Sequence, residues 1–566
     1  MQYARILFCL SLIFLVHAGF DWLSNRPQNV GVDVPSGKLA SLSFAPFREG
    51  FDPIEEIYPI PEHVEQDMGM LVGKTENIRT YSGLGGLEVA PEYARRHGLT
   101  MLQGAWLNSG VTDNQKEIDA LIQSANANAD VVKRVIVGNE VMLRKEMPIE
   151  RLIDYIRQVK RAVKQPVSYA DVWSMYMKYP QLFKEVDFIT IHILPYWEDE
   201  PIAIDHAPEH LEKIVRQVEN EAHGIAPGKS ILIGETGWPS AGRQRGEAVP
   251  SVVNAAKYIR DMVQVAQRHG FDYNIVEAFN QPWKSKLEGV VGANWGLLSV
   301  KREPVFPLTG LVYENPDWLL DFGMATGLLL IIVVARFKAL KDLSWGGSLI
   351  YLGLAQIFGV CLVTLGDFLW YTSYSHLQRS YTVVLVLVNA LLAWGVLQRC
   401  HDLLMQRSTE FTLAQWIKRG YLFFLALALY KTLLLSISGR YLSFPLEQFM
   451  IPVWGVVGLL LSRGYAQNGV GPRLAAFDEL LGLEVSTVLW RQLAYALSLG
   501  IVAMVVGETY AFMVGADFIL AHPGFFEGLP VALEYTFKNQ QLVIWLLCLL
   551  VLSVPCWTAV RNTAKV

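Results

Sequence analysis

The second half of this chain consists of long apolar runs separated by short loops that carry basic residues. The runs begin at about Trp318 and continue to the end of the 566-residue sequence. Lipid offers backbone groups no hydrogen-bonding partner, so a run of about 20 apolar residues crosses a membrane as a helix. Seven runs are candidates, at residues 318–334, 348–370, 381–397, 420–437, 449–462, 493–514 and 542–559. We therefore predict an all-α polytopic transmembrane domain over residues 318–566, with about seven spans.

Basic residues in the loops indicate how these helices are oriented, because cytoplasmic loops carry an excess of Lys and Arg. If the domain before Trp318 lies outside, the inner segments hold Arg336, Lys338, Lys341, Arg399, Arg407, Lys418, Arg419, Arg463, Arg473, Arg491, Arg561 and Lys565. The outer loops then hold only Arg379, Arg440 and Lys538. We predict that the first domain is exported and the C-terminus is cytoplasmic. The run at 449–462 is short and contains Pro452, and a re-entrant segment there would reverse everything after it.

The N-terminus has the pattern of a targeting segment. Arg5 precedes an apolar run at 6–16, and Val16-His17-Ala18 loosely fits a cleavage site. Residues 1–23 are therefore predicted to be a signal peptide or a signal-anchor helix, with a linker at 24–36. Under both alternatives the next domain of the chain is exported.

Between residues 37 and 305, apolar strand-like runs alternate with helical segments. The eight runs are 39–47, 77–82, 99–106, 133–137, 167–171, 186–193, 230–234 and 274–279. The helix expected at 148–163 opens with a proline, and Thr112 with Gln115 has the form of a capping box. This alternation predicts an α/β fold, a (β/α)8 TIM barrel over 37–305, joined to the membrane domain by a linker at 306–317.

Charge and cysteine usage exclude several classes of function. The net charge of −5 argues against a nucleic-acid-binding protein. The domain at 37–305 has no cysteine, and the sequence has no Cys-x-x-Cys or Cys/His spacing typical of a metal site. We expect neither a metal nor another cofactor.

Two glutamates follow strand-like runs of this domain. Glu140 ends Val137-Gly138-Asn139-Glu140, and Glu235 follows Ile231-Leu232-Ile233-Gly234. Catalytic groups of such barrels collect at the carboxyl ends of the strands. Two carboxylates that face each other are what glycosidic-bond cleavage requires. We therefore predict that Glu140 and Glu235 are the catalytic residues of a glycosidase.

The exported domain resembles glycoside hydrolase family 17, the β-1,3-glucanases. The resemblance rests on Val137-Gly138-Asn139-Glu140, Gly234-Glu235-Thr236-Gly237-Trp238-Pro239-Ser240-Ala241-Gly242 and Glu277-Ala278-Phe279-Asn280-Gln281-Pro282-Trp283-Lys284, and it covers roughly residues 37–305. It implies a retaining mechanism with Glu140 as acid/base and Glu235 as nucleophile. Family members often carry an acidic residue where Gln281 stands. The whole layout also resembles bacterial membrane-anchored members linked to the synthesis or remodelling of exported β-glucans.

Further residues are expected to bind the substrate, although each also has a purely structural alternative. Asn139 could donate to the sugar 2-hydroxyl or shape a turn, and Arg79 could keep Glu235 ionised or form a structural ion pair. His192 and Tyr196 could bond the nucleophile and line the −1 sugar site, or simply pack. The remaining substrate-binding candidates are Tyr81, Trp238, Trp283 and Lys284; Trp106, Trp173 and Trp197 are also possible sugar platforms.

These features predict an enzyme in the bacterial cytoplasmic (inner) membrane, with its catalytic domain on the periplasmic or extracellular side. It would hydrolyse β-1,3-glucan or transfer pieces of it, with β-1,6 branches as one transfer product. Its expected partners are β-glucan, the lipid bilayer and a glucan synthase, but no nucleic acid. One alternative is a glucan transporter or synthase partner whose membrane domain is the main functional unit; another is a sensor that only binds glucan. No Asp-x-Asp or Gln-x-x-Arg-Trp motif occurs, which argues against synthesis from sugar nucleotides.

Overall fold

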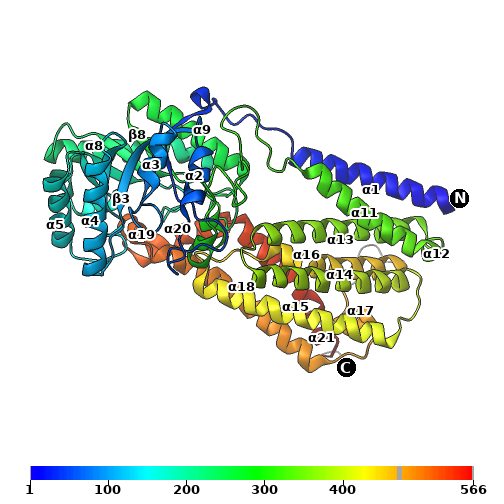
Figure 1. Cartoon of the computed structure of the whole chain (residues 1–566). Helices are drawn as coiled ribbons and strands as arrows, with labels where there is room; N and C mark the ends of the chain where they lie inside the picture. Colours follow the sequence, from blue (N-terminus) through cyan, green and yellow to red (C-terminus); the bar gives the residue numbers. More distant parts are fainter. Residues whose placement is uncertain (1, 468–473, 564–566) are drawn as a thin grey trace. The chain divides into compact units, whose positions relative to one another are not determined.

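The chain forms two compact units in this computed structural model, which describes residues 2–467 and 474–563 (Figure 1). One unit, the barrel unit, holds Pro27–Tyr313 together with Gly515–Pro523. The other, the helical unit, holds Met1–Arg26, Glu314–Val514 and Gly524–Val566. The segment Gly515–Pro523 lies between two long apolar helices in the sequence, and the prediction assigned it to the membrane domain.

The barrel unit is built on a closed barrel of eight parallel strands, β1 to β8, paired in sequence order. The strands are β1 (Leu39–Ser43), β2 (Thr75–Thr80), β3 (Thr100–Ala105), β4 (Val132–Asn139), β5 (Val167–Val172), β6 (Ile189–His192), β7 (Ile231–Thr236) and β8 (Asp272–Ile275). The predicted TIM-barrel fold is therefore confirmed. Several predicted strands were too long, because apolar residues such as Phe279 stay buried beyond the end of the hydrogen-bonded ladder.

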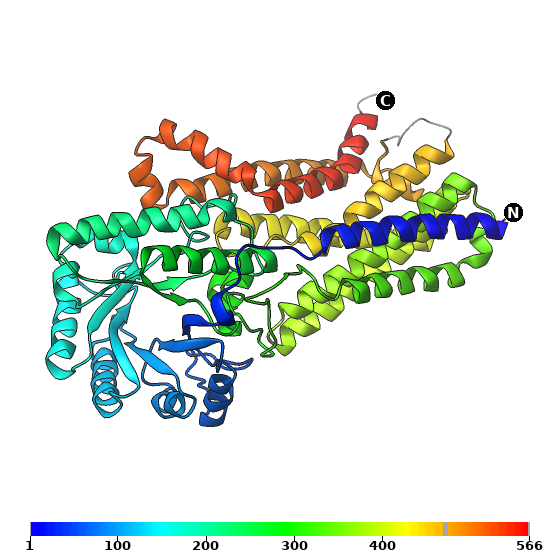
Figure 2. The same cartoon turned by 90° about the horizontal axis from the view of Figure 1, so that it is seen from above.

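Helices lie outside the ring of strands, as Figure 2 shows. They are α2 (Pro61–Gly69), α3 (Ala90–Arg96), α4 (Val111–Ala127), α5 (Ile149–Ala162), α6 (Trp173–Lys178), α7 (Leu182–Glu185), α8 (Ala207–Ile225), α9 (Val252–His269) and α10 (Ser285–Ala293), with short 3-10 turns η1 (Pro35–Gly37), η2 (Ile204–His206) and η3 (Pro282–Lys284). The core fills the space between strands and helices. Leu152, Ile156 and Val159 of α5 are fully buried there. Burial of each such side chain stabilises the folded state by roughly 1.5–3 kcal/mol relative to leaving it exposed to water.

The helix α4 begins earlier than its sequence pattern indicated. Its N-cap is Gly110, which has no side chain to cap the helix, so the predicted capping box at Thr112 is wrong. The turn before the helix is shaped by Asn108 instead, because its Oδ1 accepts the N–H of Gly110 at 2.6 Å. The predicted helix at 148–163 is confirmed as α5, with Pro148 at its N-cap.

The helical unit contains eight helices that are long and apolar enough to cross a membrane, as judged over the described residues. They are α1 (Gln2–Ser24), α11 (Trp318–Ala335), α13 (Trp345–Tyr371), α14 (His376–Leu404), α15 (Phe411–Ser438), α16 (Leu446–Ala466), α18 (Thr487–Met513) and α21 (Gln540–Thr563). Each of the seven predicted runs lies largely within one of them. The run at 449–462 belongs to α16, which is 21 residues long and therefore not too short to cross. Arg473 and Lys565, two of the predicted inner basic residues, lie outside the described residues.

Shorter helices join the long ones, and sequence periodicity did not reveal them. They are α12 (Phe337–Leu340), α17 (Phe477–Leu481), α19 (Ala516–Ala521) and α20 (Phe525–Lys538). The first long helix, α1, packs against α11 and α13 within the helical unit. It buries Ile6 and Leu10 there, and the guanidinium of Arg5 donates to the carbonyl oxygens of Leu340 and Lys341 at 3.0 and 3.1 Å.

Candidate active site

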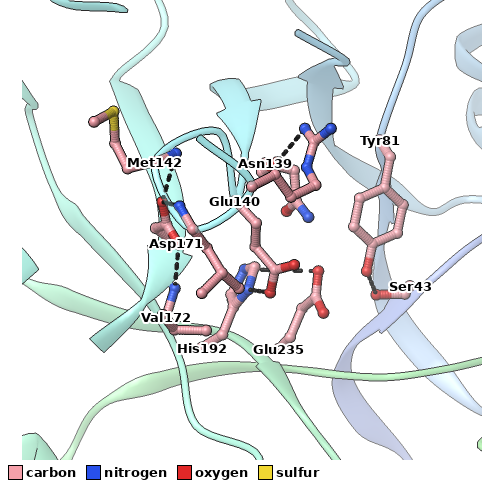
Figure 3. Close-up of polar contacts among 12 residues, drawn as sticks. Ser43, Tyr81, Asn139, Glu140, Met142, Asp171, Val172, His192 and Glu235 are labelled. Atoms are coloured by element: carbon pink, nitrogen blue, oxygen red, sulfur yellow. Dashed lines mark hydrogen bonds and ion pairs between the residues drawn. The ribbon is translucent and has the colours of Figure 1, made fainter. Parts of the chain in front are cut away.

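The two predicted catalytic glutamates lie together at the carboxyl-end rim of the barrel (Figure 3). Glu140 directly follows β4, and Glu235 is the fifth residue of β7. One oxygen of each carboxylate and one ring nitrogen of His192 all lie within 4.8 Å of one another. In retaining glycosidases the two carboxyl groups are about 5–5.5 Å apart. The pair therefore has the spacing that direct attack on a sugar carbon requires.

The backbone at the end of β4 aims Glu140 at this centre. Gly138 has φ +87° and Glu140 has φ +53°, so the chain turns sharply there. The N–H of Glu140 donates to the carbonyl of Ala170 on β5 at 2.8 Å. A Cβ atom on Gly138 would lie 2.8 Å from Cγ2 of Val141, which explains why glycine precedes the Asn-Glu pair.

Arg79, on β2, ties the ends of β4 and β7 together. Its Nη2 donates to Oδ1 of Asn139 at 2.6 Å, and its Nη1 donates to the carbonyl of Gly234 at 2.6 Å and lies 3.4 Å from Oε1 of Glu235. The side chain is only 1% exposed. Gly234 permits this approach, since a Cβ there would be 3.3 Å from Nη1 of Arg79 and 2.5 Å from Cγ2 of Thr190.

His192 is the last residue of β6 and bridges the two carboxylates. Its Nδ1 lies 2.9 Å from Oε1 of Glu140, and its Nε2 lies 3.6 Å from Oε1 of Glu235. The side chain is fully buried. The sequence interpretation paired His192 with the nucleophile, whereas the structure places it in closer contact with Glu140.

The surroundings of Glu235 favour its ionised form. Burial would raise the pKa of this carboxyl, but the positive groups of His192 and Arg79, then Lys284, and a hydrogen bond from Tyr81 hold the pKa below its usual range. Tyr81 directly follows β2, and its hydroxyl also shares a 2.8 Å hydrogen bond with Ser43. Both side chains lie beside Glu235 in Figure 3. Four of the predicted residues therefore converge on this one carboxylate.

Lys284 pairs with Glu277 rather than with residue 281. Its Nζ lies 2.9 Å from Oε1 of Glu277. Burial raises the pKa of Glu277 to about 7 despite this partner. Gln281 is buried, and its amide donates to the carbonyls of Ala45 and Phe279 at 2.7 and 3.0 Å. Its Oε1 accepts from Nε1 of Trp283 at 3.0 Å, so the neutral side chain that departs from the family pattern holds the loop together.

Tyr196 and Trp238 belong to the hydrophobic core of the barrel unit. Both are fully buried, at 0% and 1% exposed, and their rings pack together edge to face. The Tyr196 hydroxyl donates to the carbonyl of Arg243 at 2.6 Å, and Nε1 of Trp238 donates to the carbonyl of Val249 at 2.9 Å. Large aromatic rings fill the space above the barrel, and their polar ends are satisfied by loop backbone. The structure thus favours the packing alternative for these two residues.

Sequence reasoning missed Asp171, on β5. Its Oδ2 accepts the N–H groups of Met142 and Leu143 at 3.2 and 3.3 Å, and also the Tyr169 hydroxyl. It thereby holds the turn that follows Glu140 (Figure 3). Burial raises the pKa of Asp171 to about 6, with Glu140 adding to the effect. Its position at the carboxyl end of a predicted strand was the available signal.

The Glu140, His192 and Glu235 group also has the spacing of a metal-ligand triad. A cation there would engage both carboxylates, whereas glycosidic cleavage needs one to carry a proton and the other to be an unhindered nucleophile. The geometry therefore suits acid–base and nucleophilic chemistry better.

Comparison with known proteins also indicates a glycosidase. Residues 43–296 match the family model of the BtgE/BtgC glycoside hydrolase domain. A glucan 1,3-β-glucosidase of Arthroderma benhamiae is 28% identical over 269 residues, which are 45% of this chain and 86% of that protein. A glucan 1,3-β-glucosidase of Schizosaccharomyces pombe is 28% identical over 258 residues, which are 42% of this chain and 78% of that protein.

Among solved structures, the chain is similar to a glycoside hydrolase family 17 β-1,3-glucanosyltransferase of Rhizomucor miehei. The identity is 29%, the match covers 48% of this chain and 96% of that one, and the TM-score is 0.41.

The barrel unit is thus a glycosidase with a TIM-barrel fold. Its resemblance to the β-1,3-glucanases of glycoside hydrolase family 17, indicated by the sequence motifs, is confirmed.

Proposed function

We propose that this chain is a membrane-anchored retaining enzyme that acts on β-1,3-glucan outside the cytoplasmic membrane. Two of its relatives are named for glucan 1,3-β-glucosidase activity. The main observation is the facing pair Glu140 and Glu235, whose oxygens lie within 4.8 Å at the barrel rim.

In the first step, the ionised carboxylate of Glu235 attacks the anomeric carbon of the bound glucan. The glycosidic C–O bond breaks, and Glu140 donates its proton to the departing oxygen. The product is a glycosyl ester of Glu235 and a shortened glucan. Arg79, Lys284 and Tyr81 assist because they favour the negative charge that the nucleophile must carry.

In the second step, Glu140 accepts a proton from water or from a sugar hydroxyl, whose oxygen attacks the anomeric carbon. The ester bond breaks and Glu235 regains its charge. Because Oδ1 of Asn139 accepts from Arg79, its NH2 group is the end of the amide that a sugar 2-hydroxyl would meet. Water gives hydrolysis; a sugar hydroxyl gives transfer, and a 6-hydroxyl gives a β-1,6 branch.

Product analysis tests this proposal. The full-length protein, in membranes or detergent, is incubated with laminari-oligosaccharides, and products are separated and their linkages determined. Shorter products alone mean hydrolysis, longer products mean transfer, and new β-1,6 linkages mean branching. Unchanged substrate, with protein shown to be folded, would exclude both forms of the enzyme.

We further propose that the long apolar helices cross the bacterial inner membrane, with the N-terminus inside and the barrel unit outside. Eight helices are long and apolar enough, and α16 at 21 residues removes the need for a re-entrant segment. The packing of α1 on α11 and α13 favours a retained anchor helix over a cleaved signal peptide. We propose residues 37–305 as the limits of the glycosidase domain and residues 318–566 as the limits of the membrane domain.

The alternative in which the membrane domain is the main functional unit has one observation in its favour. A single apolar helix is sufficient to anchor a domain, yet this chain has eight candidates. Replacing residues 318–566 with a single-span anchor tests it. Normal glucan export in cells carrying that variant would show that the helical unit only anchors the enzyme, whereas lost export with normal activity in vitro would favour transport or partnership with a synthase.

A further inference from the structure

The barrel unit includes a segment that the chain reaches only after most of its long apolar helices. Residues Gly515–Pro523, which contain α19, fall in the same compact unit as Pro27–Tyr313. They directly follow α18 and precede α20 (Figure 1). We call Gly515–Pro523 the docking segment.

Two neighbouring acidic residues of the barrel hold the two ends of α19. Oδ2 of Asp199 accepts the N–H of Asp517 at 2.9 Å in the first turn. Oε1 of Glu200 lies 3.2 Å from Nε2 of His522, just past the last turn. Between them, the ring of Phe518 is 1% exposed and packs on the His522 ring at 4.8 Å. The contact therefore combines a helix-end hydrogen bond, a hydrogen bond between Glu200 and His522, and a buried aromatic side chain.

Gly515 makes the close approach possible. A Cβ atom at this position would lie 2.7 Å from Cγ and 3.0 Å from Cβ of Asp199. The absence of a side chain lets the start of the segment lie directly against the acidic residue that accepts its hydrogen bond.

Asp199 and Glu200 belong to the loop between β6 and α8, which starts immediately after His192. On its other side this loop is held by Arg245, whose Nη1 donates to the carbonyls of Tyr196 and Glu198 at 2.8 and 3.1 Å. The loop is thus fixed between the strand that carries His192, the loop after β7 and the docking segment. In TIM barrels the loops that follow the strands build the active-site face, and this loop follows the strand that ends in His192.

We propose that the docking segment positions the β6–α8 loop, so that an outer loop of the membrane-spanning part sets the shape of the cleft wall next to His192. The contact of the docking segment with the barrel does not depend on the proposed reaction. The effect of that contact on glucan cleavage rests on the proposed function. The segment acts on the site through the loop, and its residues position rather than catalyse.

The order of the apolar helices agrees with this docking. Six candidate spans, α11, α13, α14, α15, α16 and α18, separate Tyr313 from Gly515. An even number of crossings returns the chain to the side from which it started. If α16 did not cross, the segment would emerge on the opposite side of the bilayer, where it could not reach the barrel.

A disulfide experiment tests docking without reference to activity. In full-length protein whose native cysteines are replaced, Asp199→Cys is combined with Gly515→Cys and oxidised in membranes. Disulfides need Cβ atoms about 3.5–4.5 Å apart, which a small shift from 3.0 Å provides. Mass spectrometry is expected to find the linked peptides.

The control pair Gly224→Cys with Gly515→Cys should stay reduced, because a Cβ at Gly224 has no heavy atom within 4 Å. No link in the first pair, with both thiols reactive, would overturn the docking.

Kinetics test the positioning. Glu200→Ala, His522→Ala and the double variant are compared on laminari-oligosaccharides of increasing length. Each is expected to raise KM about two- to fivefold with kcat unchanged, and the double variant should match the singles, because all three remove the same hydrogen bond between Glu200 and His522. Arg95→Ala, which removes an exposed pair with Asp130 elsewhere on the barrel, should leave KM unchanged. Additive effects, or KM unchanged in all variants despite a formed disulfide, would overturn the positioning role.

Discussion

The two carboxylates of the site differ in the charges around them. Glu235 lies near Arg79, Lys284 and His192, which favour its ionised form. Glu140 contacts His192 at 2.9 Å, and its charge adds to the raised pKa of Asp171 and, together with Glu235, to that of Glu288; Arg79 and Lys284 act on Glu235. Enzymes that assign different roles to two acids do so through such differences in environment. The surroundings therefore favour Glu235 as the nucleophile and Glu140 as the proton carrier.

Removing each carboxylate should have a distinct chemical consequence. Glu140→Ala and Glu235→Ala should each lower kcat by about 10²–10⁴-fold. Azide can occupy the space of either side chain. In Glu140→Ala it attacks the glycosyl ester and yields a β-glycosyl azide, whereas in Glu235→Ala it attacks the substrate directly and yields the α product. NMR of the azide products checks this assignment, and the reverse stereochemistry would exchange the two roles.

The pH dependence of activity should reflect the lowered pKa of Glu235. A carboxyl whose pKa is lowered in the folded protein stays ionised at neutral pH and becomes protonated only as pH falls through that lowered value. Activity should therefore persist below the usual pKa of glutamate, about 4.3. Tyr81→Phe removes a hydrogen bond to the ionised form and should move the acidic limb of the kcat/KM profile upward by about one pH unit. Tyr58→Phe, a half-exposed tyrosine, serves as the control; an unmoved limb in Tyr81→Phe would contradict the assignment.

At the scale of elements, the end of β4 is the critical turn. Gly138→Ala combines a positive φ with a Cβ contact of 2.8 Å to Val141, so it should shift Glu140 and lower kcat by about 100-fold or more. Gly98→Ala is matched, because Gly98 also has a positive φ but has open space around a Cβ. It should cost about 1 kcal/mol of stability and little activity. Equal activity losses in the two variants would show that backbone strain, rather than placement of Glu140, matters.

At the scale of the whole molecule, the proposed topology predicts which loops are reachable from outside. In a cysteine-free background, Arg440→Cys between α15 and α16 should react with a membrane-impermeant maleimide in intact spheroplasts. Gln406→Cys, an exposed position between α14 and α15, should react only after permeabilisation. The reverse pattern would invert the membrane domain. A tag at the N-terminus that is retained in the mature protein would show that α1 is an anchor.

Much of the site could be predicted from sequence because parallel strands end on one side of a barrel. Glu140, Glu235, Arg79 and His192 each lie within a strand or just after one, so the fold alone gathers them. Tyr196 and Trp238 could not be assigned in this way. They lie in loops, and only the packing there shows that their polar ends bond to backbone carbonyls.

The periodicity and length of the apolar runs were sufficient to predict the eight-stranded barrel and the long apolar helices. Both predictions use only the order of apolar and polar residues within a short stretch of the chain, because that order determines which side chains of a strand or helix are buried. The carboxylate pair followed from the same local order. The contacts of Asp171 with the turn after Glu140, the bracing role of Gln281 and the docking of Gly515–Pro523 on the barrel did not follow from it. They join residues that lie far apart in the chain, and such contacts depend on how the folded elements come together in space.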